Sequence, residues 1–394
     1  MFELTLTPPV IALFSVLVAA VLYLLFGFRH YVVSVSRRVT ADSSREFPSE
    51  SEMTYPSVSV IVYSEDDAEN LGILLPQILG QDYPGLFEVI VVNDGAISST
   101  KDVIARLEQN HSNLYMTFTP GQSRSLSRKK LAVTLGIKAA RYDVVVHTTG
   151  NCQIPSKLWL RAIGRRFVPG TDIVIGYAAP TAAADETREP RKRLHAFDTV
   201  RTAVEYLSWA IAGRPYRGTC HNLAYRRNVF FDNKGFSRSL DLKYGDDDVF
   251  VSQVANGDNT AVELSADSMV LSVETDPAAS HRARKLRYGF TASKVRGHAR
   301  AFFSSCTLAW WISLGATVAL SLVGLPSFIP MIAACVILIA TWIVLMLAWK
   351  RTSVSLWSRG IFITFPWFMT IHPFYSFFYR LKGLSNRKSN YSWG

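Results

Sequence analysis

Long runs without a charged residue mark the parts of this chain that can enter a membrane. The first run extends from Pro9 to Phe28 and is long enough, at helical rise, to cross about 30 Å of hydrocarbon. The second run, 301–349, is too long for one span, and Gly324 and Pro326 would break a helix within it. The pattern therefore predicts transmembrane helices over 9–28, 301–325 and 327–349, the last two joined by a tight turn.

A further apolar run covers residues 360–379. It contains Pro366, His372 and Pro373, which interrupt a regular apolar helix. Non-helical backbone at membrane depth occurs where protein or a water-filled cavity surrounds it. We therefore expect this run to be either a transmembrane or a re-entrant helix.

Basic residues flank the predicted membrane helices on one side. Arg29, Arg37 and Arg38 follow the first helix, and a dense basic group precedes the next one between residues 282 and 300. The positive-inside rule places the segment between them in the cytoplasm, which predicts a protein integral to the cytoplasmic membrane. A short tail at 1–8 and a basic tail at 380–394 complete the chain. If every later run spans, the basic tail lies outside, whereas a re-entrant last run keeps it inside.

The formal net charge of +11 raises the question of nucleic-acid binding. Much of this excess lies beside the predicted membrane helices, where anionic lipids attract basic residues. No recognised nucleic-acid-binding motif accompanies the charge. We expect membrane lipids, and no nucleic acid, as its partners.

The water-facing part begins with a polar segment and continues into an alternating pattern. Residues 29–55 are expected to form a juxtamembrane linker, because Ser, Glu, Asp and Thr dominate from Val39 onward. A folded α/β domain is expected over 56–300. In its first half β-branched runs alternate with helical patterns, which predicts a parallel sheet, whereas the strand order of the less regular second half stays open. The predicted strands are 58–63, 87–92, 114–118, 144–147 and 223–225, and the predicted helices are 68–79, 129–140, 192–211 and one that opens at Asp246.

Polar motifs follow several of these strands, at the sheet edge where ligands of parallel sheets bind. Glu65-Asp66-Asp67 follows the first strand, Asn93-Asp94-Gly95 follows the second, and Ser127-Arg128-Lys129 opens a helix. Two further blocks are Gly218–Arg226 and Gly245-Asp246-Asp247-Asp248. The order and spacing of these blocks resemble the family 2 glycosyltransferases, which have the GT-A fold, and in particular the bacterial membrane-anchored type.

The resemblance implies a Rossmann-like nucleotide-binding sheet and an inverting enzyme, a hexosyl- or N-acetylhexosaminyltransferase of cell-envelope polysaccharide biosynthesis. It implies transfer from a nucleotide-sugar donor to a lipid-linked or cell-surface polysaccharide acceptor at the cytoplasmic face of the bacterial inner membrane. Without it, Asp94 reads equally as part of an Asp-Gly turn and Lys129 as an exposed helix start. The donor-binding residues that it implies are Tyr63, Glu65, Asp94, Lys129, Asn151, Arg284 and Arg287.

One block departs from the family. Members carry Asp-x-Asp after the fourth strand, because two carboxylates hold the Mg²⁺ or Mn²⁺ that neutralises the leaving diphosphate. This chain has Thr149-Gly150-Asn151 there, and Asn151 offers a cation only an uncharged amide oxygen. Three interpretations follow: weaker metal binding through Asn151, stabilisation of the leaving group by Lys and Arg side chains, or a protein without turnover.

The acidic triplet carries the expected chemistry. Inversion needs one carboxylate that takes the proton of the acceptor hydroxyl as it attacks. The resemblance assigns this role to Asp247, with Asp246 as the second choice, whereas a purely structural interpretation is an acidic helix start. On the acceptor side the resemblance implies His221, Asn222 and Tyr288.

A second hypothesis comes from a different functional class. Because no carboxylate remains in the Asp-x-Asp motif, the chain could be a membrane scaffold or regulatory subunit that binds nucleotide or glycan without turnover. The intact triplet Asp246–Asp248 favours the enzyme.

Overall fold

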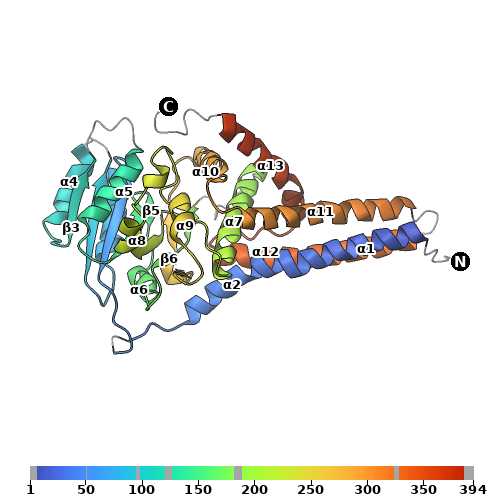
Figure 1. The fold of residues 1–394 in the computed structure, drawn as a ribbon, viewed down its shortest axis with the longest axis horizontal. Coiled ribbons are helices and arrows are strands. Elements are labelled where there is room, and N and C mark those ends of the chain that lie inside the picture. The colour runs from blue at the N-terminus through green and yellow to red at the C-terminus, as the bar shows by residue number, and fades with distance from the viewer. Residues whose placement is uncertain are drawn as a thin grey trace. The chain divides into compact units, whose positions relative to one another are not determined.

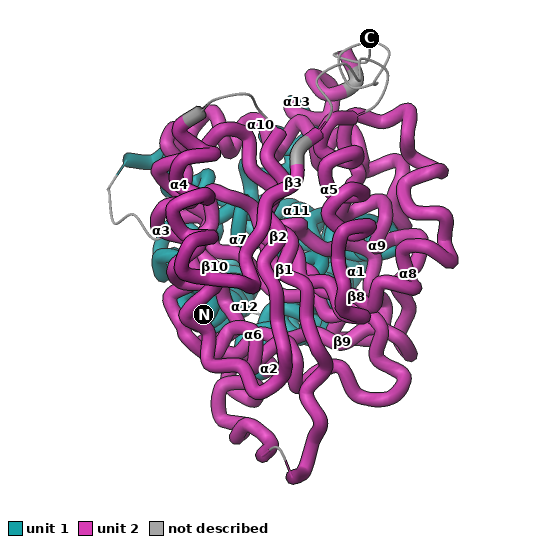
Figure 2. Tube along the Cα trace, turned by 90° about the vertical axis from the view of Figure 1, so that its left-hand side faces the viewer, with its two compact units in different colours: residues 1–37, 186–208, 297–378 teal, residues 38–185, 209–296, 379–394 magenta. Residues whose placement is uncertain are grey.

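The computed structural model describes residues 7–49, 51–94, 98–119, 127–181, 189–323 and 328–385. The chain divides into two compact units, which Figure 2 shows in different colours. Unit 1 comprises residues 1–37, 186–208 and 297–378, and unit 2 comprises residues 38–185, 209–296 and 379–394.

Unit 2 is built on a seven-stranded mixed sheet with the order β3-β2-β1-β4-β8-β6-β9 (Figure 1). β1 pairs in parallel with β2 and β4, and β2 with β3, as the alternating pattern predicted. β8 runs antiparallel to β4 and β6, in the second half of the domain, for which the sequence left the strand order open. The strands are β1 (Val58–Ser64), β2 (Phe87–Asn93), β3 (Leu114–Phe118), β4 (Val144–Thr149), β6 (Ile173–Ile175), β8 (Leu223–Arg226) and β9 (Thr260–Val262).

A smaller sheet, with the order β5-β10-β7, forms from segments distant in sequence. Its strands are β5 (Cys152–Gln153), β7 (Ala178–Pro180) and β10 (Val270–Ser272). β10 pairs antiparallel with β5, so that Ser272 lies opposite Cys152. This pairing brings the segment after β10 beside the end of β4.

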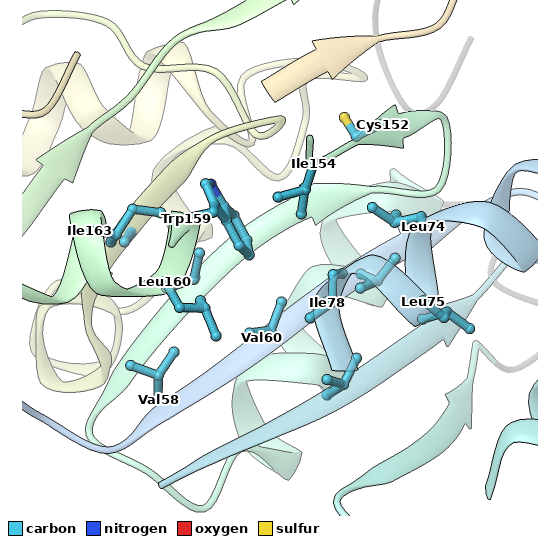
Figure 3. Close-up of a cluster of buried hydrophobic side chains, with 14 of the residues drawn as sticks. Val58, Val60, Leu74, Leu75, Ile78, Cys152, Ile154, Trp159, Leu160 and Ile163 are labelled. Atoms are coloured by element: carbon cyan, nitrogen blue, oxygen red, sulfur yellow. The ribbon is translucent and has the colours of Figure 1, made fainter. Parts of the chain in front are cut away.

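Helices cover both faces of the large sheet. Side chains at alternate positions of a strand point to opposite faces. On one face, Val58 and Val60 pack with α3 (Ala68–Leu79) and α6 (Trp159–Gly164), as Figure 3 shows. On the other face α5 (Arg128–Ala139) lies so close that a β-carbon at Gly136 would approach Ile61 to 2.7 Å. This close packing fixes the N-terminus of α5 beyond the strand ends.

The remaining helices of this region are α4 (Ser98–Glu108), α8 (Arg227–Asp232), α9 (Asp248–Val254) and α10 (Pro277–Thr291), and α7 (Pro190–Ile211) belongs partly to each unit. The predicted strands agree with the observed ones to within two residues at each end, as do the predicted helices 68–79, 129–140 and 192–211. α4 was not predicted. The helix expected to open at Asp246 begins at Asp248.

Unit 1 contains most of the membrane-length helices. Three helices of the described chain are long and apolar enough to cross a bilayer: the continuous helix Pro8–Ser44, α11 (His298–Val323) and α12 (Ile329–Ser355). They match the predicted spans, although the predicted turn at 324–327 lies outside the described residues. The run predicted as transmembrane or re-entrant belongs largely to α13 (Phe365–Ser385), which has Pro373 inside it and is not one of these three.

The expected linker at 29–55 is helical over its first half, which corrects that prediction. α1 (Pro8–Tyr23) continues through a π-helical turn at Leu24–Phe28 into α2 (Arg29–Ser44). The physical reason lies in the sequence, because Pro48 is the first proline or glycine after Gly27 and little stops the helix earlier. At a rise of about 1.5 Å per residue, such a helix extends well beyond about 30 Å of hydrocarbon.

The end of α2 is held in unit 2 by a buried charge network. Glu263 is fully buried and accepts from Arg165 Nη2 at 2.9 Å and from Arg166 Nε at 2.5 Å. Asp42 pairs with Arg166 and accepts from the Leu264 backbone N–H at 3.0 Å. Burial by itself raises the pKa of Glu263, but the two arginines outweigh it and hold that pKa below 4.5. The polar residue Asp42 at the end of α2 therefore attaches this helix to the rest of unit 2 and does not serve mainly to contact solvent.

We expect Glu263→Gln to lower the stability of unit 2 strongly, because it leaves two buried guanidinium groups with less compensating charge. Breaking a buried pair in this way costs about 3–5 kcal/mol, and thermal unfolding in detergent measures it. The matched control Asp82→Asn removes the ion pair between Asp82 and Arg161, whose atoms lie 3.9 Å apart. The side chain of Asp82 is 68% exposed, so this variant should change the melting temperature little. The wild-type advantage should be present above about pH 4.5 and lost as the pH falls through the lowered pKa of Glu263. Equal melting temperatures for both variants would contradict the assignment.

Candidate active site

The carboxyl ends of the central strands bring the predicted site segments together. Tyr63, near the end of β1, lies opposite Thr149 of β4, and Ser64 lies opposite Asn93 of β2. Beyond the strands, the Asp94 backbone N–H donates to Ser64 O at 2.8 Å, and the Gly150 N–H donates to Tyr63 O at 2.7 Å. The segments after β2 and β4 therefore flank the end of β1.

Tyr63, Glu65 and Asp94 form one hydrogen-bonded cluster at this edge. The Tyr63 hydroxyl lies 2.5 Å from Glu65 Oε1 and 3.2 Å from Asp94 Oδ2. Asp94 Oδ1 accepts from Thr119 Oγ1 at 2.7 Å and from Arg128 Nε at 2.8 Å. The side chain of Arg128 is 52% exposed, so a ligand can displace it from Asp94 at little cost.

The two lysines at the start of α5 have different surroundings. Lys129 Nζ lies 2.8 Å from Asp246 Oδ2 and 2.9 Å from Cys220 Sγ, so it faces the acidic triplet. Lys130 is buried and donates to the carbonyl oxygens of Ser239 and Leu242. Burial lowers the pKa of Lys130 to about 8. Lys129 is the lysine that the structure brings to the site.

The acidic triplet begins with a turn that only glycine adopts easily. Gly245 has φ +100°, and a β-carbon there would lie 2.8 Å from Val249. Asp247 is the N-cap of α9, and its Oδ1 accepts from the Asp248 N–H at 2.7 Å. The structural interpretation of an acidic helix start is therefore correct for Oδ1. The second oxygen, Oδ2, faces Arg287 and the Cys220 N–H.

Each buried carboxylate of the triplet has a cation or a hydroxyl opposite it. Asp246 pairs with Lys129 and Asp247 with Arg287, whereas Asp248 accepts from Thr291 Oγ1 and lies 4.0 Å from Arg217. Burial by itself would raise the pKa of Asp247, but Arg287 and Lys129 outweigh it and lower that pKa. Burial and the neighbouring charge of Asp247 raise the pKa of Asp248. The triplet is thus asymmetric, with Asp247 strongly held in its ionised form.

One face of α10 supplies two of these four partners, Arg287 and Thr291. Arg284, Arg287, Tyr288 and Thr291 are spaced by three and four residues, which places them on one side of a helix. Arg284 Nη1 donates to Glu274 Oε1 at 2.8 Å, and the Tyr288 ring lies 4.3 Å from the Arg217 guanidinium. The structure therefore brings Arg284, Arg287 and Tyr288 to the same site as the triplet, as the sequence predicted.

The Thr149-Gly150-Asn151 segment offers a poor donor set for a divalent cation. Asn151 Oδ1 accepts from Thr149 Oγ1 at 2.7 Å, and Asn151 Nδ2 donates to Val273 O at 3.2 Å. Another group of potential ligand atoms is Cys220, Asp246 and Asp247, but both carboxylates already pair with fixed cations. Hard cations prefer uncompensated carboxylate oxygens. The residues present at Asn151 do not fit Mg²⁺ or Mn²⁺.

Asn222 does not have the predicted acceptor role. Its side chain is buried, and Nδ2 donates to Tyr177 O at 3.0 Å and to Ser268 O at 2.8 Å, while Oδ1 accepts from Trp159 Nε1 at 3.2 Å. All of its polar atoms therefore hold strands and α6 together. The adjacent His221 is only partly buried, and burial together with Lys129 and Arg287 lowers its pKa to about 3. His221 is a neutral imidazole at pH 7.

Sequence reasoning missed several residues of the site. Arg217 and Glu274 contact its charged residues, and Cys220 lies beside Lys129. The hydroxyl of Tyr177 is buried and has no hydrogen-bond partner among the described residues, so a bound ligand can use it. These residues stand in segments whose pairing is non-local. The only sequence signal for a role in the site was the residue type: Arg217 is basic and Tyr177 is aromatic with a hydroxyl group.

Comparison with known proteins identifies the domain. Residues 57–231 match the profile described as Glycosyl transferase family 2. These residues form a family 2 glycosyltransferase domain. Its sheet and flanking helices give the expected GT-A fold. The match ends before the acidic triplet, so the role of Asp247 in this glycosyltransferase is a proposal.

A solved structure is similar to the glycosyltransferase over most of its length. It is a mannosyltransferase, PcManGT, from Pyrobaculum calidifontis, in complex with GDP-Man and Mn²⁺. The two chains are 20% identical, with a TM-score of 0.49, and the similarity covers 88% of this chain and 95% of the other. No curated protein matches the sequence significantly.

We expect Asn222→Ala to destabilise the glycosyltransferase domain, because it leaves Ser268 O and Trp159 Nε1 buried without their partners and removes one of the two donors to Tyr177 O, which also accepts from the Val270 N–H at 3.2 Å. Each such group costs about 1–3 kcal/mol, so thermal unfolding should occur well below the wild-type temperature. The neighbouring variant His221→Ala is the matched control and should unfold near the wild-type temperature. If His221→Ala unfolded at a lower temperature than Asn222→Ala, the structural role of Asn222 would be contradicted, and its predicted role on the acceptor side would stand.

Proposed function

We propose that this protein is an inverting glycosyltransferase that transfers a sugar from a nucleotide-sugar donor to a lipid-linked or cell-surface glycan acceptor. The observation that carries the proposal is the pairing of Asp247 with Arg287 at the carboxyl edge of a family 2 domain. A carboxylate able to take a proton thus lies beside a guanidinium able to bind a phosphate.

The proposed reaction uses Asp247 as general base. The acceptor hydroxyl oxygen attacks the anomeric carbon, its proton passes to Asp247, and the bond from carbon to the diphosphate oxygen breaks with its electron pair on that oxygen. Attack from the face opposite the diphosphate inverts the anomeric configuration. Asp246 is already engaged by Lys129, which supports Asp247 as the first choice.

Donor binding prepares this base. Arg287 holds the pKa of Asp247 low, which makes Asp247 a weak proton acceptor. A diphosphate that binds Arg287 competes with Asp247 for the same guanidinium, so the pKa of Asp247 rises when the donor arrives. The base therefore gains strength only when a sugar is present to be transferred.

The nucleoside end of the donor lies at the Tyr63, Glu65 and Asp94 cluster. The Asp94 carboxylate is held by an exposed arginine and two hydroxyl groups, and ribose hydroxyls can replace these partners. The transferred sugar is a hexose or an N-acetylhexosamine, as in the family that the sequence resembles. Lys129 stands between this cluster and the triplet, near the donor phosphates.

The three membrane-length helices support the proposed acceptor and membrane face. The basic residues after the first helix and between 282 and 300 support a cytoplasmic catalytic domain in a bacterial inner membrane. An enzyme tethered in this way meets lipid-linked acceptors in two dimensions, which raises their effective concentration. A role in cell-envelope polysaccharide synthesis is consistent with this position.

A non-catalytic scaffold is the second candidate, favoured by the missing Asp-x-Asp carboxylates. The structure weakens one argument against it, because Asp246 and Asp247 have ion-pair partners and Asp248 accepts from Thr291, so they need no substrate to remain buried. The two candidates differ in one observable, which is turnover. A protein that binds UDP or GDP but never releases a sugar from any donor is the scaffold.

We expect Asp247→Asn to abolish sugar transfer, because an amide takes no proton from the acceptor. The loss of a general base is on the order of 10²–10⁴-fold in rate. Purified protein, a panel of labelled UDP- and GDP-sugars and a membrane lipid extract measure it. NMR of the wild-type product should show the anomeric configuration opposite to that of the donor.

The control is Asp232→Asn at the exposed end of α8, which should transfer sugar at the wild-type rate. Binding of UDP or GDP by Asp247→Asn should remain, because the proposed nucleoside contacts are unchanged. Full transfer by Asp247→Asn would remove it from the mechanism, and retained anomeric configuration would exclude inversion.

A further inference from the structure

Two departures from the family pattern, far apart in sequence, meet at one place in unit 2. The first is Asn151 in place of the second Asp-x-Asp carboxylate. The second is in the segment Arg284-Lys285-Leu286-Arg287-Tyr288, which stands where processive members of the family carry Gln-x-x-Arg-Trp, so that Arg284 replaces the glutamine. The Val273 N–H donates to Asn151 O at 2.8 Å, and Asn151 Nδ2 donates to Val273 O at 3.2 Å. The next residue, Glu274, accepts from Arg284 Nη1 at 2.8 Å.

The small sheet explains this convergence. The antiparallel register that places Ser272 opposite Cys152 continues beyond both strands, which brings Val273 to Asn151 and Glu274 toward Gly150. The side chain of Glu274 is 5% exposed and that of Arg284 is 26% exposed. A buried carboxylate thus holds a more accessible guanidinium beside the segment where the family binds its metal ion.

The charge of Arg284 acts on the same residue, His221, as the other site cations. Burial lowers the pKa of His221, and the positive charges of Lys129, Arg287 and Arg284 lower it further. Arg284 and Arg287 stand one helical turn apart on the same face of α10. This face of α10 therefore presents two guanidinium groups on one side of the site.

We propose that Arg284, positioned by Glu274, takes the place of the family's metal ion in neutralising the leaving diphosphate. The proposal rests on the glycosyltransferase function given above. In metal-dependent members two carboxylates hold a divalent cation, and here one carboxylate holds one monovalent cation, so the net charge of the arrangement is the same. As the carbon–oxygen bond breaks, the diphosphate gains one negative charge, and Arg284 and Arg287 together carry the charge of one divalent ion.

Glu274 acts as a positioning residue in this arrangement. A guanidinium loses much less conformational freedom on binding phosphate when one of its edges is already fixed. Glu274 accepts from Nη1, and a guanidinium carries five N–H donors in a planar fork, so one arginine can bind both a carboxylate and a phosphate. This arrangement converts a flexible arginine into a pre-oriented phosphate ligand.

The test measures binding of UDP and GDP by titration calorimetry, and sugar transfer, each with EDTA and with added Mn²⁺. The wild type should bind and transfer equally in both media. Arg284→Gln restores the family's glutamine and should bind about tenfold or more weakly and transfer on the order of 10²-fold more slowly. The matched control Arg282→Gln, on an exposed position of the same helix, should behave as the wild type.

Restoring the metal motif should rescue the loss. The triple variant Thr149→Asp, Asn151→Asp, Arg284→Gln should regain binding and transfer with Mn²⁺ and lose both in EDTA. Arg284→Lys keeps the positive charge and should bind UDP and GDP more tightly than Arg284→Gln. This variant still tests the role of the charge if the glutamine variant folds poorly.

Glu274→Gln separates positioning from charge. It leaves Arg284 cationic and replaces its ion pair with a weaker, neutral hydrogen bond. The removed negative charge offsets the lost pre-orientation, so UDP and GDP should bind about as tightly as to the wild type while kcat falls about tenfold, and Glu274→Asp should restore part of kcat. A purely structural role would instead lower the melting temperature and affect KM and kcat together.

The outcomes distinguish this proposal from the function on which it rests. A wild type that is inactive in EDTA and restored by Mn²⁺, with Arg284→Gln equal to Arg282→Gln, would overturn the role of Arg284 and leave the transferase intact. Binding of UDP or GDP that depends on Arg284, without transfer from any donor, would overturn the transferase and leave the phosphate site.

Discussion

Burial of three consecutive carboxylates is the constraint on which the site depends. Asp246, Asp247 and Asp248 stand almost out of contact with water, where like charges repel strongly and solvent compensates little. The fold is stable only if cations and donors from other segments reach them. Lys129, Arg287, Thr291 and Arg217 meet this need, and they come from α5, α10 and the segment before β8.

The same pairs connect folding with chemistry. Because Arg287 pairs with Asp247, the group that would bind the leaving diphosphate is also the group that restrains the base. Donor binding therefore acts on both ends of the reaction through one guanidinium. Arg284 lies outside this pair and is held by Glu274, so it can bind phosphate without disturbing the triplet.

Local patterns allowed much of the fold to be predicted from sequence, whereas non-local pairing did not. The strands at 58–64 and 87–93 are continuous apolar runs bounded by turns, so periodicity identified them and placed Asp94 at their carboxyl edge. The antiparallel entry of β8 and the pairing of β5 with β10 join segments distant in sequence, which no local pattern reveals. Asn222 was misassigned for this reason, because the role of a buried amide depends on which carbonyls it meets. The helix over 29–44 was missed because polar composition was taken as solvation, although Asp42 is buried.

The central claim is that fixed side chains, and not a metal ion, receive the diphosphate beside the buried base. The most direct measurement is an experimental structure of the full chain with a non-hydrolysable nucleotide-sugar and Mn²⁺, with anomalous scattering used to locate manganese. The account predicts phosphate oxygens within hydrogen-bond distance of Arg284 and Arg287, the anomeric carbon facing Asp247, and no manganese bound to Asn151. Manganese that bridges the diphosphate to Asn151, with both arginines turned away from the phosphates, would contradict it.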